Sequence, residues 1–120
     1  MPRNWTPSDI EDRFDELSKQ MDEAVADLED AENDYHVCKA NFEIDIARER
    51  LNLLRTPGVK MTVGEREDEA LTRCEDQRRS LGAAEARVRA ARANIGRINV
   101  QVDLARSMST SIRTSIDMTS

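Results

Sequence analysis

The chain has 120 residues and a formal net charge of −6, with 35% charged and only 3% aromatic residues. This composition is typical of coiled coils and long helices, and it excludes a globular core built from large aromatic and aliphatic side chains. No apolar run approaches the roughly 20 residues that a membrane helix needs, and no apolar segment follows Met1 as in a secretion signal. We therefore expect a cytosolic protein of one domain, residues 1–120, without membrane contact.

The first long helix is predicted over residues 7–55. Thr6 fits the N-cap position, Pro7 the first helical position, and Asp9 places a negative charge in the first turn. From Ile10 onward, apolar residues recur at the alternating spacings of a heptad repeat. The residues of this repeat are Ile10, Phe14, Leu17, Met21, Ala24, Leu28, Ala31, Tyr35, Cys38 and Phe42.

The repeat changes near the end of this helix, where Asp45 occupies the next position due for an apolar residue. We predict that a parallel apolar repeat takes over there. Its members are Val37, Ala40, Ile44, Ala47, Leu51 and Leu54. Two explanations of the overlap remain open, a local stutter that relaxes the supercoil and a contact with a second neighbour.

A turn over residues 56–62 is predicted to separate this helix from the next. Pro57 cannot continue a helix, and Gly58 supplies a permissive backbone. Thr62 and Glu65 then match a capping box, with Thr at the N-cap and Glu three residues later.

The second helix is predicted over about residues 63–116. Its tail, residues 107–120, is rich in Ser and Thr, which are weak helix formers, so we expect fraying there unless a partner holds it.

The apolar repeats of the two helices fit each other in an antiparallel pair. If the pair is centred on the turn, Phe14 faces Ala105 and Tyr35 faces Ala84, so large side chains meet small ones. The fold class is therefore predicted to be all-α, with two long antiparallel helices forming a coiled-coil hairpin. The predicted intramolecular seam consists of Phe14, Leu17, Met21, Leu28, Tyr35, Leu81, Val88, Ala91, Ile95, Ile98 and Val102.

Charge is distributed unevenly, in a way that supports the same hairpin. Acidic residues predominate over residues 9–34, and arginine predominates over residues 77–113. In the antiparallel pair the acidic stretch lies along the basic one. The individual flanking pairs are mixed, and Asp34 with Arg87 is one of the favourable pairs that we predict.

A second apolar stripe on the second helix predicts oligomerisation. It repeats the heptad two positions later, which places it nearly opposite the intramolecular seam. Two helices that touch along one seam bury little core, so a dimer or a four-helix-type oligomer is expected. The candidate oligomer face consists of Ala83, Ala86, Ala90, Ala93, Val100 and Leu104.

The sequence contains no pattern that predicts catalysis. There is no Gly-rich phosphate loop and no nucleophile elbow. His36 and Cys38 point to different faces of a helix, and no four ligands for a structural zinc converge. We interpret Cys38 and Cys74 as reduced thiols packed as small core residues. We expect no enzyme activity, cofactor or metal.

Nucleic-acid binding through arginines of the second helix is the main alternative function, because arginines contact phosphates. The competing explanation is that these arginines pair with the acidic first helix, and the second helix has no aromatic residue on which bases could stack. The candidate contacts are Arg78, Arg79, Arg87, Arg89, Arg92 and Arg97.

Several short stretches together resemble a group of short coiled-coil proteins of unassigned function that actinobacterial bacteriophages encode. They are Met61–Val63, Glu67–Leu71, Ala84–Arg92 and Gln101–Ser107. The resemblance implies a phage protein made in the host cytoplasm, and no functional residue is carried over from it.

The predicted function is therefore a non-enzymatic, oligomeric coiled-coil protein of interaction or assembly. Its partners would be its own copies and a phage or host protein. The alternatives are an accessory protein of phage recombination or replication that contacts DNA, and a structural or assembly component of the virion.

Overall fold

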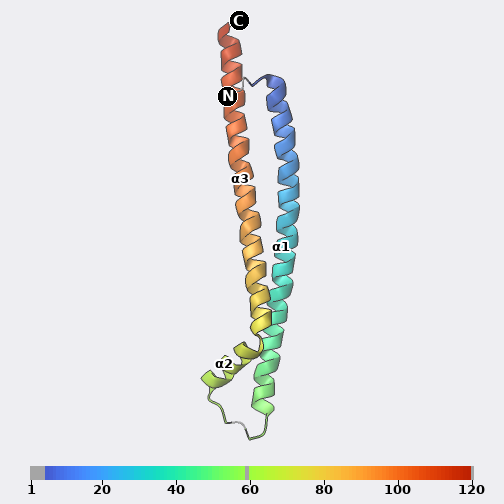
Figure 1. Cartoon of the computed structure of the whole chain (residues 1–120), viewed down its shortest axis with the longest axis vertical. Helices are drawn as coiled ribbons and strands as arrows, with labels where there is room; N and C mark the ends of the chain where they lie inside the picture. The colour runs from blue at the N-terminus through green and yellow to red at the C-terminus, as the bar shows by residue number, and fades with distance from the viewer. Residues whose placement is uncertain (1–4, 59, 120) are drawn as a thin grey trace. The chain divides into compact units, whose positions relative to one another are not determined.

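The computed structural model describes residues 5–58 and 60–119, in which the chain forms three helices and no strand (Figure 1). They are α1, Pro7–Arg55, then α2, Val63–Arg73, and α3, Glu75–Thr119. The prediction of an all-α fold is confirmed. Val59 and Ser120, which the predicted turn and tail include, lie outside the described residues, as do residues 1–4.

Helix α1 begins at the N-cap that the sequence predicts, Thr6, and the structure adds that the cap is reciprocal. The Thr6 hydroxyl accepts a hydrogen bond from the Asp9 backbone N–H at 3.2 Å, and the Asp9 carboxylate accepts one from the Thr6 N–H at 2.9 Å. Two of the donors that a helix start leaves unpaired are thereby satisfied. After α1 ends, Gly58 adopts a φ of 81°, a left-handed backbone that a residue with a Cβ adopts only with strain.

Helix α2 begins at the predicted N-cap. Thr62 has an extended backbone, and its hydroxyl accepts a hydrogen bond from the Glu65 N–H at 3.2 Å. Glu65 also lies in the first turn, where its negative charge faces the positive end of the helix. The N-cap at Thr62 predicted from the sequence is confirmed.

The second half of the chain differs from the single helix predicted over residues 63–116, because α2 and α3 are separated at Cys74. The Cys74 N–H is shared between the carbonyls of Ala70 at 3.1 Å and Leu71 at 3.2 Å, an arrangement common at helix ends. Nearby, the Thr72 hydroxyl donates to the Asp68 carbonyl at 2.9 Å, a bond that often bends helices. Figure 1 shows α2 leaving the direction of α3 at this point.

The helices contribute to two compact units. The terminal unit comprises Met1–Leu28 and Ala90–Ser120, and the turn unit comprises Glu29–Arg89. Each unit therefore contains part of α1 and part of α3, and the turn unit also contains α2.

The terminal unit is an antiparallel pair of helical segments (Figure 1). Its direction is shown by the Arg13 guanidinium, which donates to Gln101 Oε1 at 3.1 Å, and by a surface hollow in which Ile10 lies with Ile112. The core alternates large and small side chains, as expected for closely packed helices. Its buried members are Leu17, Ala24, Ile98 and Ala105, packed against Phe14, Met21, Ile95 and Val102.

The turn unit is also antiparallel, and it is linked by ion pairs between α1 and the two other helices. Asp34 pairs with Arg87, as predicted, and Glu49 pairs with Arg73 at 3.2 Å. Its buried apolar residues come from all three helices and from Cys74 between α2 and α3. They are Ala31, Ile46, Leu53, Ala70, Cys74, Ala84 and Val88.

The structure corrects the prediction that a second apolar repeat takes over the inward face of α1. The parallel repeat that begins at Val37 does not take over the packing, because its members are exposed. Instead the inward face continues from Phe42 to the buried Ile46 and Leu53. Residues four apart lie on the same side of a helix. Ile46, four residues after Phe42, therefore packs inward where the heptad repeat would have placed Asp45. The residues predicted for the intramolecular seam are all buried or half-buried within the chain.

The Ser/Thr-rich tail is helical as far as Thr119. Its hydroxyls bond to the helix backbone: Thr110 donates to the Arg106 carbonyl at 3.1 Å, and Thr114 donates to the Thr110 carbonyl at 3.0 Å. These bonds satisfy the hydroxyl donors within the helix.

Candidate functional site

The most prominent unpartnered surface is an apolar stripe on α1 within the turn unit. Its four large side chains are between 49% and 59% exposed, although all are aliphatic. They recur with two alanines at heptad spacing, which is the pattern that receives a second helix. We call this surface the α1 stripe, and it consists of Val37, Ala40, Ile44, Ala47, Leu51 and Leu54.

The α1 stripe lies on the side of α1 that faces away from the packed residues of the turn unit. On a helix with 100° per residue, its midline is about 170° from that of the face formed by Cys38, Phe42 and Ile46. Single exposed apolar residues are ordinary, whereas a contiguous apolar patch is a recognised mark of an interaction site. The stripe is therefore the leading candidate site for a partner.

The candidate oligomer face on α3 is exposed at each of its six positions. Val100 is 58% and Leu104 is 60% exposed, and the four others are alanines. Ala83 and Ala86 belong to the turn unit, and the remaining members belong to the terminal unit. The face offers less apolar area per residue than the α1 stripe, because alanine buries little surface.

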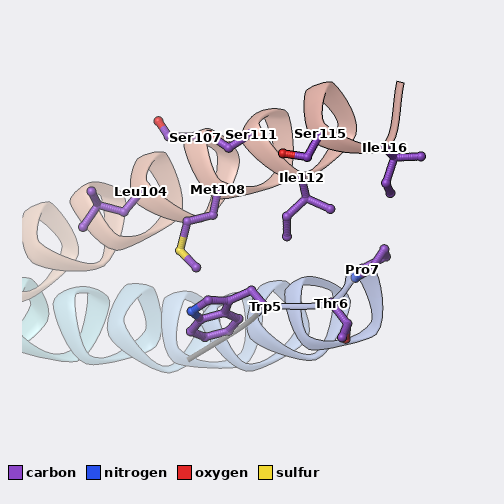
Figure 2. A pocket seen from close by; sticks show the side chains of 10 residues that line it. All are labelled: Trp5, Thr6, Pro7, Leu104, Ser107, Met108, Ser111, Ile112, Ser115 and Ile116. Atoms are coloured by element: carbon purple, nitrogen blue, oxygen red, sulfur yellow. The ribbon is translucent and has the colours of Figure 1, made fainter. Parts of the chain in front are cut away.

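An open apolar groove of about 810 Å³ lies in the terminal unit, between the start of α1 and the end of α3. Figure 2 shows Met108 and Ile112 projecting from α3 toward Trp5 and Pro7. The hydroxyls of three serines lie along α3 beside these apolar side chains. The lining residues are Trp5, Thr6, Pro7, Leu104, Ser107, Met108, Ser111, Ile112, Ser115 and Ile116. Sequence reasoning missed this groove.

The six arginines proposed to contact nucleic acid are all exposed, and several have partners in the chain. Arg79 pairs with Glu75 at 2.7 Å, and Arg87 pairs with Asp34 across the helix pair. Arg97 donates to the Asn94 side chain at 2.5 Å. Pairing within the chain thus explains some of these arginines. Their partners lie on α3 as well as on α1.

The two cysteines are free thiols, with Cys38 half-buried and Cys74 1% exposed. Burial raises the pKa of the Cys74 thiol, and the negative charges of Glu49 and Asp45 raise it further.

Within residues 5–58 and 60–119, no group of three or more His, Cys, Asp or Glu residues is placed to hold a metal ion. None of the helices described has a stretch long and apolar enough to cross a membrane.

The two thiols are expected to differ in reactivity. Only the thiolate is nucleophilic, so a raised pKa and burial both slow the alkylation of Cys74. At pH 8, we expect iodoacetamide to label Cys38 at least about tenfold faster than Cys74, and Cys74 labelling to increase at a higher pH than labelling of a free thiol. Mass spectrometry of the digested protein measures both rates. In urea the two rates should converge, and equal rates in the folded protein would contradict the burial of Cys74.

Comparisons of the chain with protein-family models, with curated proteins and with solved structures found no match.

Proposed function

We propose that the chain is a non-enzymatic coiled-coil protein of interaction or assembly, which forms oligomers and acts by binding helices of other proteins. The observation that carries the proposal is the α1 stripe. An amphipathic helix recognises another helix through apolar residues at heptad spacing, and this stripe presents such residues on the outer side of an already folded helix. Packing on its other face already orders the backbone of α1. Binding of a partner therefore does not carry the entropy cost of forming this helix.

The Ala-rich face of α3 is the second surface in this proposal. Gly82 and Gly96 flank it, and a Cβ added to either would meet no atom within 4 Å. Each glycine lowers helix propensity by about 1 kcal/mol relative to alanine, and nothing in the chain's own packing requires it. The close approach of another helix along this face would explain both glycines.

We also propose a phage context, with the protein made in the host cytoplasm. This part rests on the resemblance of residues 61–63, 67–71, 84–92 and 101–107 to helical proteins of actinobacterial phages.

A capture experiment with surface variants tests the function. The tagged full-length chain is compared with Ile44→Glu/Leu51→Glu in the α1 stripe and with Ala86→Glu/Ala93→Glu in the α3 face, using lysate of an actinobacterial host. Two charges in an apolar contact should lower the captured amount of a genuine partner at least about tenfold. The matched control is Asn52→Glu, an exposed polar position of α1 outside both surfaces.

We expect at least one protein that the wild type and the control retain and that one surface variant loses. Identical sets of captured proteins for the wild type and both surface variants would overturn the proposal. Circular dichroism confirms that each variant keeps its helix content.

A further inference from the structure

The residues of the α1 stripe alternate in size in a way that fits a copy of the same stripe. Large side chains stand at Val37, Ile44, Leu51 and Leu54, and alanines stand at the two positions between the first three. We propose that the α1 stripe is covered by the α1 stripe of a second copy of this chain, running antiparallel in a two-fold symmetric dimer. This inference rests on the proposed function. It names a second copy as the partner that pairs with the α1 stripe, so that other proteins bind the stripe of the dissociated chain or the α3 face.

Antiparallel pairing places every alanine of the stripe against a large side chain. In such a pair an a position faces a d position, so Ile44 faces Ala47 of the second copy and Ala40 faces its Leu51. Val37 faces Leu54 in the outermost layers. The symmetry axis passes between Ile44 and Ala47, so each layer occurs twice. Even filling of the layers is what close packing requires.

The charges beside the stripe favour the same arrangement. Antiparallel pairing brings Glu43 beside Arg50 of the second copy, and Asp34 beside its Arg55. Within the chain Arg50 already contacts Glu67 and Asp34 contacts Arg87, but their side chains remain 46% and 64% exposed and can accept a second neighbour. No like charges meet along the stripe, because the remaining flanking cation, Arg48, lies beside the uncharged Asn41.

A parallel pairing of the same two stripes is less favourable. It stacks Ala40 on Ala40 and Ala47 on Ala47, which leaves two layers underfilled. It also brings Arg50 beside Arg55 of the second copy, twice, and these like charges offset the two favourable pairs of Glu43 with Arg48 that the parallel arrangement forms. Layer size and charge therefore both select the antiparallel dimer.

The contact is short, since the stripe spans about 27 Å of helix. It lies at the low end of the areas found in specific complexes. We therefore expect a dimer that dissociates on dilution, and sedimentation equilibrium of the full chain over a wide concentration range should show the mass move from one chain toward two. Ile44→Glu should weaken this association at least about tenfold, because it places a carboxylate in two central layers. The exposed side chain makes this variant safe for folding.

Disulfide trapping tests the direction. In a Cys38→Ser background, a mixture of Ala40→Cys and Leu51→Cys chains should oxidise to a covalent dimer that contains one of each. Ala40→Cys alone should give no covalent dimer, whereas parallel helices would bring its two thiols together. Cys74 is buried and does not compete.

Three results would overturn the inference. They are a strict monomer at millimolar concentration, a dimer that Ile44→Glu leaves intact and Ala93→Glu abolishes, and covalent dimers from Ala40→Cys alone. The proposed function is judged separately. If the chain is a monomer but Ile44→Glu/Leu51→Glu loses a captured protein, the function stands and self-pairing fails.

Discussion

Replacing Leu17 with alanine is expected to lower the free energy of unfolding by about 2–5 kcal/mol, among the largest effects of any single truncation in the chain. Leu17 is 1% exposed and is the largest fully buried apolar side chain of the terminal unit. Two of its buried neighbours, Ala24 and Ala105, are too small to move into the space that the substitution opens. Urea denaturation followed by far-ultraviolet circular dichroism measures the change.

The same substitution at Leu104 provides the matched control. Leu104 also lies in the terminal unit, but it is 60% exposed, so Leu104→Ala should change the free energy of unfolding by less than about 0.5 kcal/mol. The comparison is made at micromolar protein, where a weak dimer is dissociated. Equal losses for the two variants would contradict the core assigned to the terminal unit, and they would instead indicate that Leu104 is covered by another chain.

The features that the sequence predicted well are those that depend on neighbouring residues or on an unbroken period. The caps at Thr6 and Thr62 follow from residue types within one turn, and both are present. The ion pair of Asp34 with Arg87 follows from the antiparallel pairing of two heptad repeats centred on the turn.

The break at Cys74 was not predictable from the same signals. Ala70, Cys74 and Gln77 keep the heptad spacing across it, and neither Gly nor Pro marks it in the sequence. The break is a property of the backbone, where one N–H serves two carbonyls while both Ala70 and Cys74 become buried. A periodicity records which side of a helix is apolar, and a bend that keeps that side inward leaves the periodicity unchanged.

The seam of α1 shows a second limit. Between Val37 and Leu54 the helix is apolar on two sides, and periodicity alone cannot decide which side packs inward. The polar residue Asp45 favoured the stripe starting at Val37 as the inner face, whereas packing in the turn unit buries Ile46 and Leu53.

The groove beside Trp5 is a further feature that periodicity does not predict. It depends on where the chain enters α1 relative to the last turns of α3, which is a contact between distant residues.

Replacing Gln77 with methionine is expected to raise the free energy of unfolding by about 1–3 kcal/mol. Gln77 occupies a seam position of α3 in the turn unit, and its Oε1 is buried without a hydrogen-bond partner among the described residues. An acceptor removed from water and left unpaired destabilises the folded state by about this amount. Methionine has a similar length and flexibility and carries no such acceptor, so it keeps the packing while removing the penalty.

Gln101→Met in the terminal unit is the control, and its effect should have the opposite sign. Gln101 is half-buried on the same helix, but its Oε1 accepts a hydrogen bond from Arg13 at 3.1 Å. The substitution removes that bond and should lower the free energy of unfolding by about 1 kcal/mol. Both changes are read from urea denaturation under one set of conditions. If Gln77→Met destabilised the protein as Gln101→Met does, Gln77 would have to donate or accept a hydrogen bond that stabilises the fold. The polar seam position would then contribute to stability through its side-chain amide.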